Sequence, residues 1–188
     1  AVNRFEAYLS DTNVPKTAPK PTVEDLTKAC LKDVTAANLD DVLTTLDDPA
    51  TDTTTLAKMQ EAVQSVNDAI AKTAALQKIQ DYATSNADGS KPAPVAQDFI
   101  DAGVNNAATN LDKVNQAIAT MVAGDVDSTS EVQAIVDAVN KLEAYLADTN
   151  VPKTAPKPTV EDLTKAGLKD VTAANLDDVL TTLDDQAT

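Results

Sequence analysis

Ala138 to Thr188 reads AVNKLEAYLADTNVPKTAPKPTVEDLTKAGLKDVTAANLDDVLTTLDDQAT, and nearly the same letters occupy Ala1 to Thr51. The two stretches lie 137 residues apart, and only five of the 51 aligned pairs differ. The differing pairs are Arg4/Lys141, Phe5/Leu142, Ser10/Ala147, Cys30/Gly167 and Pro49/Gln186. Such identity at a fixed offset is a sign of tandem repetition. The chain is therefore expected to be a window on a longer array.

A weaker copy lies between these two stretches. Phe99-Ile-Asp-Ala-Gly-Val104 is similar to Leu163-Thr-Lys-Ala-Gly-Leu168, and Asn110-Leu-Asp-Lys-Val114 is similar to Asn175-Leu-Asp-Asp-Val179. The 137-residue period therefore contains two diverged units. The predicted organisation is the end of a preceding repeat's helix (1–12), a first three-helix unit (13–85), a second three-helix unit (86–149) and the start of a third unit (150–188).

Each predicted unit opens with a polar segment that is rich in proline. These segments are Asn13 to Pro21, Asn86 to Pro94 and Asn150 to Pro158. Proline fixes φ and cannot continue a helix, so extended connectors are expected. Their sequences, such as VPKTAPKP, leave two interpretations open: a semi-rigid strap or a polyproline ligand for a partner domain.

A short helix is expected after each connector. Thr22-x-x-Asp25 and Thr159-x-x-Asp162 match capping boxes, with Asp in place of the usual Glu. Pro94 is expected to open the matching helix of the middle unit. Gly103 and Gly167 stand where a left-handed residue ends a helix.

A second helix is expected to begin near Thr35, Ala107 and Thr172. In the first copy its apolar positions recur at helical spacing and form one face: Leu39, Val42, Leu43 and Leu46. An acidic break then follows, at Asp47-Asp48 and at Asp125 to Asp127.

A third helix is expected after the acidic break, and Ser128-x-x-Glu131 is its capping box in the middle unit. Its apolar stripe there is Val132, Ile135, Val136, Val139, Leu142 and Leu146; in the first unit the stripe is Leu56, Met59, Val63, Val66 and Ile70, continuing through Leu76 and Ile79 to Tyr82. When Val66-Asn67 is aligned with Val139-Asn140, the first unit carries nine extra residues before the next capping Asp. If helical, they add about 13 Å.

The predicted fold is all-α, with tandem three-helix bundles joined by Pro-rich connectors into an elongated rod. One apolar stripe per helix has to be buried against the other helices of its unit. Units in series contact only their neighbours.

The bulk composition limits the classes of partner. The net charge is −15 and the pI is about 4.1, so nucleic acid and anionic membrane surfaces are disfavoured and an acidic, secreted surface is expected. No apolar run is long enough to span a bilayer, and the start is interpreted as amphipathic helix rather than a signal peptide.

Catalytic chemistry is not expected. The chain has no histidine, which removes His-based triads and His metal sites. The single cysteine, Cys30, has Gly167 as its counterpart, so it is interpreted as a natural variant or an engineered handle. Asp125 to Glu131 resembles a calcium loop but lacks the Gly and the final Glu of that motif, so a helix cap is favoured.

Other candidate groups also have structural interpretations. Asp40-Asp41 and Asp47-Asp48 are expected to be solvated acidic faces. Tyr8, Tyr82 and Tyr145 recur on the apolar stripe at helical spacing, so packing within or between units is favoured over binding anchors. No catalytic, cofactor-binding or metal residue is assigned.

The patterns AGL-x-x-VTAANLDDVL and AGV-x-x-x-x-x-NLDKVNQAI resemble helical repeats of very large secreted bacterial surface proteins and adhesins. The order of short helix, Ala-Gly-[Leu/Val], second helix, acidic break and third helix is also similar to the three-helix GA modules of albumin-binding proteins. The resemblance implies an extracellular location at a bacterial cell surface. It also implies binding through the second helix, if the GA-type activity is shared.

The leading functional hypothesis is a structural spacer in a long adhesin-type protein that projects adhesive domains from the cell. The alternative is a GA-like module that captures a host or matrix protein through a helix face. Expected partners are the neighbouring repeats of the same chain and a host or matrix protein, with no nucleic acid and no direct membrane insertion.

Overall fold

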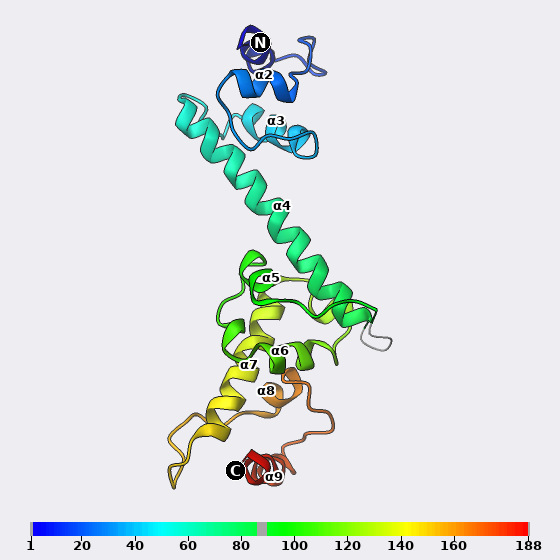
Figure 1. Cartoon of the computed structure of the whole chain (residues 1–188), viewed down its shortest axis with the longest axis vertical. Helices are drawn as coiled ribbons and strands as arrows, with labels where there is room; N and C mark the ends of the chain where they lie inside the picture. The colour runs from blue at the N-terminus through cyan, green and yellow to red at the C-terminus, as the bar shows by residue number, and fades with distance from the viewer. Residues whose placement is uncertain (1, 86–89, 188) are drawn as a thin grey trace. The chain divides into compact units, whose positions relative to one another are not determined.

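The chain is all-helical over residues 2–85 and 90–187, the part that the computed structural model describes. Within those residues there are nine α-helices, two short 3₁₀ helices and no strand. The elements are α1 (Val2–Ser10), α2 (Val23–Lys28), α3 (Leu39–Asp47), α4 (Leu56–Ser85), α5 (Ala96–Asp101), η1 (Ala107–Asn110), α6 (Leu111–Ile118), η2 (Ala123–Asp125), α7 (Thr129–Ala147), α8 (Val160–Lys165) and α9 (Leu176–Ala187) (Figure 1). The all-α prediction is confirmed.

The predicted capping boxes are present. The Thr22 hydroxyl accepts the N–H of Asp25, and the Asp25 carboxylate accepts the N–H of Thr22 at 3.0 Å. Thr159 and Asp162 form the same pair at the start of α8. Since both orphan donors are satisfied locally, a helix of six residues has a defined start.

The short helices also end as predicted, on residues with positive φ. Gly103 has φ 78° and Gly167 has φ 89°. Cys30 stands at the equivalent position in the first copy with φ 66°. The prediction that Pro94 opens α5 is wrong: Val95 is the N-cap residue, because the Asp98 carboxylate accepts its N–H at 2.9 Å.

The second helices begin later than predicted. Thr35 and Thr172 lie in turns, and α3 and α9 start four residues after them. In the first copy Asn38 Oδ1 accepts the N–H of Thr35 at 2.7 Å. This bond closes a turn ahead of the helix. In the middle segment, the residue predicted to start the second helix, Ala107, begins the 3₁₀ helix η1. The α-helix α6 starts after η1.

The connectors are non-helical where they are described. The first and third lie between α1 and α2 and between α7 and α8. Residues 86–89 of the middle connector lie outside the described residues, and residues 90–95 are non-helical.

The chain forms two compact units, Ala1–Ala71 and Lys72–Thr188. This division falls inside α4, so the predicted repeat boundaries at 13–85, 86–149 and 150–188 stay a prediction. The first unit has one apolar core, drawn from α1 to α4 and the loops between them: Phe5, Leu26, Leu31, Val34, Val42, Leu43, Leu46, Ala62, Val63 and Val66.

Over its described residues, the second unit has two apolar clusters. The larger includes Ile79 of α4 and, from α5 to α7, Phe99, Val104, Val114, Ile118, Val126, Val132, Ile135, Val136 and Val139. The smaller is built on Leu142, Leu163 and Leu180. Helix α7 supplies side chains to both clusters and packs against α6 and α8 (Figure 1). A long helix therefore completes one cluster and begins the next.

Two differences in helix length follow from single features of the sequence. Helix α4 has 30 residues and α7 has 19, so the extra residues of the first unit are helical, as predicted. Helix α3 has nine residues, whereas its near-identical copy α9 has 12. Pro49 stands where the copy has Gln186, and a proline disfavours helical φ and ψ in the residue before it.

Candidate binding surfaces

Two side chains of α4 bind the loop that joins α2 to α3. The Gln60 amide accepts the N–H of Lys32 at 2.8 Å and donates to the Lys32 carbonyl at 3.3 Å. Asn67, about two helical turns further on, donates to the carbonyl of Asp33 at 3.1 Å and accepts from the Asn38 amide at 2.6 Å. We call Gln60 and Asn67 the first polar clamp.

A second polar clamp, Gln133 and Asn140 of α7, makes the same bonds in the second unit. Gln133 accepts the N–H of Asn105 at 2.8 Å and donates to its carbonyl at 3.3 Å. Asn140 donates to the carbonyl of Asn106 at 3.1 Å and accepts from the Asn110 amide at 2.8 Å. The two clamps recur in segments whose sequences have otherwise diverged.

Sequence reasoning used the Asn67/Asn140 pair only as an alignment marker and missed its role. The available signal was a Gln and an Asn seven residues apart on the apolar stripe of each long helix. The partners could not be read from the sequence, because they are backbone groups and one Asn side chain about 30 residues away.

An ion pair also recurs at the start of each short helix. The capping aspartate contacts a cation of the preceding long helix in Lys78–Asp98 (2.6 Å) and Lys141–Asp162 (2.6 Å). In the first copy Arg4–Asp25 is the looser equivalent, at 3.3 Å. The Arg4/Lys141 difference therefore keeps the charge that this contact needs.

These contacts lower the pKa of the capping carboxyls. Burial pushes the pKa of Asp162 upward, but the bonds from Lys141 and Thr159 outweigh it, so the net shift is downward. The same balance, with Lys78 and the N–H of Val95, lowers the pKa of Asp98. These groups serve helix initiation.

The first and third Pro-rich connectors are each held by one aspartate. In the third connector the Asp148 carboxylate accepts the N–H groups of Ala155 at 2.6 Å, Asn150 at 3.0 Å and Thr154 at 2.5 Å. These donors hold the pKa of Asp148 well below its ordinary range. Asp11 makes the equivalent bonds in the first connector. Each of these connectors is thus a loop whose conformation is fixed by hydrogen bonds to one carboxylate.

A lysine ties each of these connectors to the second helix of its copy. Lys153 Nζ lies 2.9 Å from the Asp184 carboxylate and 5.1 Å from the centre of the Tyr145 ring. Lys16 repeats this with Asp47 at 2.7 Å and the Tyr8 ring at 4.9 Å. Asp47, predicted to be solvated, is therefore paired and half-buried, whereas Asp40 pairs with Lys20 and remains exposed.

The tyrosines lie where packing was predicted. Tyr8, Tyr82 and Tyr145 are each half-buried and each packs against a different apolar cluster. In Tyr8 and Tyr145 the ring face also meets the connector lysine.

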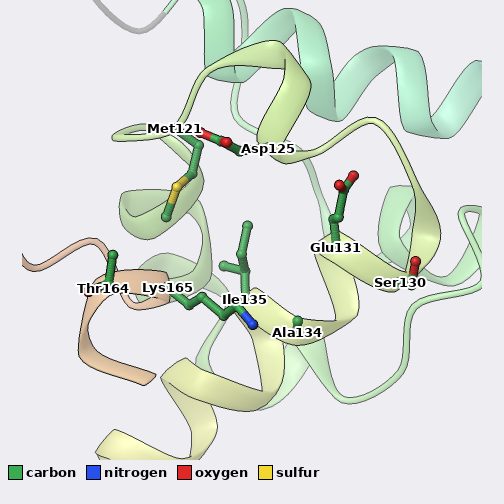
Figure 2. A pocket seen from close by; sticks show the side chains of 8 residues that line it. All are labelled: Met121, Asp125, Ser130, Glu131, Ala134, Ile135, Thr164 and Lys165. Carbon is green, nitrogen blue, oxygen red and sulfur yellow. The ribbon is translucent and has the colours of Figure 1, made fainter. Parts of the chain in front are cut away.

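A hollow of about 500 Å³ in the second unit is lined by residues from η2, α7 and α8. Figure 2 shows Ile135 toward its middle, with Met121 and Asp125 above it, Glu131 to the right and Lys165 to the lower left. Glu131 accepts the N–H of Ser128 at 3.1 Å as the predicted capping box, and Lys165 pairs with Glu161 at 2.6 Å. The polar rim is thus engaged in capping and pairing.

The calcium-like stretch is used for helix capping. The Asp125 carboxylate accepts the N–H of Val122 at 3.1 Å, and Glu131 accepts those of Asp127 and Ser128. A side-chain hydrogen bond with Glu131, together with the negative charge of that carboxylate, raises the pKa of Asp127. Among the described residues, no three His, Cys, Asp or Glu side chains are grouped in a way that could hold a metal ion.

No family model, curated protein or solved structure matches the chain. Within residues 2–85 and 90–187, no helix is both long enough and apolar enough to cross a bilayer.

Proposed function

We propose that this chain is a structural spacer, a stretch of tandem three-helix repeats in a long bacterial cell-surface protein of the adhesin type. Its role is to hold an adhesive domain away from the cell. In this proposal the repeats are joined in series into an elongated rod, and the length of the rod sets the distance between the adhesive domain and the cell.

The recurrence of long-range contacts carries the proposal. The first and second polar clamps join the same elements at matching positions of diverged segments. Among the described residues, the cation–aspartate pair occurs at the starts of α2, α5 and α8. Contacts of this kind, which recur along the chain in corresponding segments, are what an array of like units requires.

The spacer proposal is tested by small-angle X-ray scattering on the whole chain. A globular protein of this length has a radius of gyration of about 16 Å. The proposal predicts a clearly larger value, with a distance distribution that has a long tail. A monodisperse monomer with the globular value contradicts it.

The competing GA-like role, capture of a host or matrix protein through a helix face, is tested in parallel. The chain is immobilised and exposed to serum and to matrix extract. Saturable binding that is abolished by replacing exposed Asp40 and Asp41 of α3 together with their counterparts Asp177 and Asp178 of α9, with the fold intact, would favour the binding module over the spacer.

A further inference from the structure

The two near-identical stretches of the chain bury the same side chains to different extents. In the first copy Leu31, Val34 and Val42 are buried, with 2%, 8% and 0% of their surface exposed. Their counterparts Leu168, Val171 and Val179 are only half-buried. Since the residues are the same, the difference comes from what packs over them.

In the first copy the covering element is the N-terminal half of α4. Met59, Ala62, Val63 and Val66 join the cluster that contains Val34 and Val42. The first polar clamp fastens this helix to the loop beneath it. In the second copy the cluster around Leu180 contains, among the described residues, only side chains of α7, α8, α9 and the loop between the last two.

In the first copy, Gln60 and Asn67 bind groups of the loop before α3. The second copy has the same groups in the loop before α9, in the same local geometry. Asp170 has φ 61°, and Asp33 has φ 62°. Asn175 donates to the Asp170 carbonyl at 3.0 Å and accepts the N–H of Thr172 at 2.6 Å, as Asn38 does with Asp33 and Thr35. The loop is therefore formed before any helix covers it.

We propose that the face made by Leu168, Val171, Asn175, Leu176 and Val179, here called the α9 face, is a docking site for an amphipathic helix of the α4 type. The partner needs an apolar stripe like Met59, Val63 and Val66, and a Gln and an Asn seven residues apart. The Gln amide binds the backbone of Lys169. The Asn bridges the carbonyl of Asp170 and the amide of Asn175.

The polar groups make this partner more specific than an apolar surface alone. A side-chain amide carries both a donor NH2 group and an acceptor oxygen, which together match the carbonyl and the N–H of a single residue, and Gln60 already makes this pair with Lys32. A carboxylate at either clamp position could not donate to these carbonyls. The proposal goes beyond the spacer role and does not depend on it.

The test is an NMR titration of the isotope-labelled whole chain with a peptide of residues 55–72. Glu61 and Ser65 are exposed, so a lactam bridge between Glu61 and the side chain introduced by Ser65→Lys keeps the peptide helical without touching the binding stripe. Saturable shifts are expected for amides of residues 168–179. A peptide carrying Gln60→Ala and Asn67→Ala is expected to bind about tenfold more weakly.

A matched pair of chain variants completes the test. Asn175→Ala is expected to weaken binding of the unaltered peptide severalfold. Thr182→Ala, an exposed change on the same helix, is expected to leave it unchanged. The absence of saturable shifts with the helical peptide, shifts mapping away from residues 168–179, or equal binding by both peptides would each overturn the proposal. None of these results depends on the shape of the chain in solution.

Discussion

Single residues decide how closely two elements approach in the second unit. A Cβ added at Gly167 would lie 3.1 Å from the Ala117 Cα and 3.1 Å from the Thr120 hydroxyl. The backbone there also has φ 89°, a conformation that L side chains adopt only at a cost. Cys30, its counterpart, is exposed. In the first copy the side chain therefore meets no such close contact, and only the positive φ of the backbone is unfavourable.

A graded glycine series follows from these distances. Gly167→Ala is expected to lower the free energy of unfolding by about 2–3 kcal/mol, from the positive φ and the close contacts together. Gly103→Ala, with φ 78° and a nearest contact of 3.6 Å, is expected to lower it by about 1 kcal/mol. Gly124→Ala, where a Cβ meets nothing within 4 Å, is the control. Urea unfolding measures all three, and equal losses would contradict the contact argument.

Asp148 is expected to make the stability of its connector dependent on pH. Its pKa is lowered in the folded chain by the N–H groups of Ala155 and Asn150. A carboxyl with a lowered folded pKa stabilises the fold above its unfolded pKa, and this stability is lost as pH falls through the folded pKa. Asp148→Asn should therefore destabilise the chain at neutral pH.

The difference between the parent chain and Asp148→Asn should shrink as pH falls below about 4, the ordinary value for an aspartate. Urea unfolding at a series of pH values measures it. A difference that stays constant down to strongly acidic pH would show that the carboxylate charge is not what fastens the connector.

At the scale of elements, each long helix serves two clusters along its length. Val132, Ile135 and Val139 of α7 lie in the larger cluster of the second unit, and Leu142 lies in the smaller one. The second polar clamp, Gln133 and Asn140, lies on the part of α7 that contributes to the larger cluster, where it fixes the position of the stripe relative to the preceding loop. The clamp amides can reach their backbone partners at one position of the helix only. The clamp therefore fixes the register of the long helix against the loop, whereas an apolar stripe alone would allow the helix to slide.

Replacing Asn140, one of the two residues of the second clamp, tests whether the clamp fixes the register of the helix. Asn140→Ala leaves the carbonyl of Asn106 and the amide of Asn110 without this partner, so the free energy of unfolding should fall by about 1–2 kcal/mol. Glu143→Ala on the same helix is the control and should have little effect. Amide hydrogen exchange should quicken most in the loop around Asn106. A loss no larger than that of the control would contradict the prediction.

At the scale of the whole molecule, the dominant feature is the excess of acidic groups. The chain has 30 acidic and 15 basic residues, for a net charge of −15. Most of the ion pairs are at the surface, where each is worth about 0–1 kcal/mol. Self-repulsion of the remaining charge is therefore expected to outweigh what the pairs contribute.

Salt is accordingly expected to stabilise the chain. A change from about 10 mM to about 1 M sodium chloride shortens the Debye length from about 30 Å to about 3 Å, so the melting temperature should rise, by about 2–4 °C for each kcal/mol gained. The combined change Glu6→Gln and Glu143→Gln removes two negative charges and should reduce the salt effect. A melting temperature that falls with salt would show that the ion pairs dominate.

The sequence by itself determined the repeat, the helical class, the capping boxes and the apolar stripes. These features depend on residues three or four positions apart, so local spacing is enough to predict them. The starts of the second helices were predicted wrongly from the sequence. In the first copy, the Asn38 side chain closes a turn with Thr35, and α3 begins only after that turn.

Only the tertiary structure decided which faces are covered. Val34 and Val171 stand in almost the same 51 residues, yet one is buried and the other half-buried. Burial depends on what a distant helix brings to the surface, and so do the bonds of Gln60 and Asn67 to backbone groups about 30 residues away. A local sequence window does not contain that information, and this is why the clamps and the α9 face emerged only from the fold.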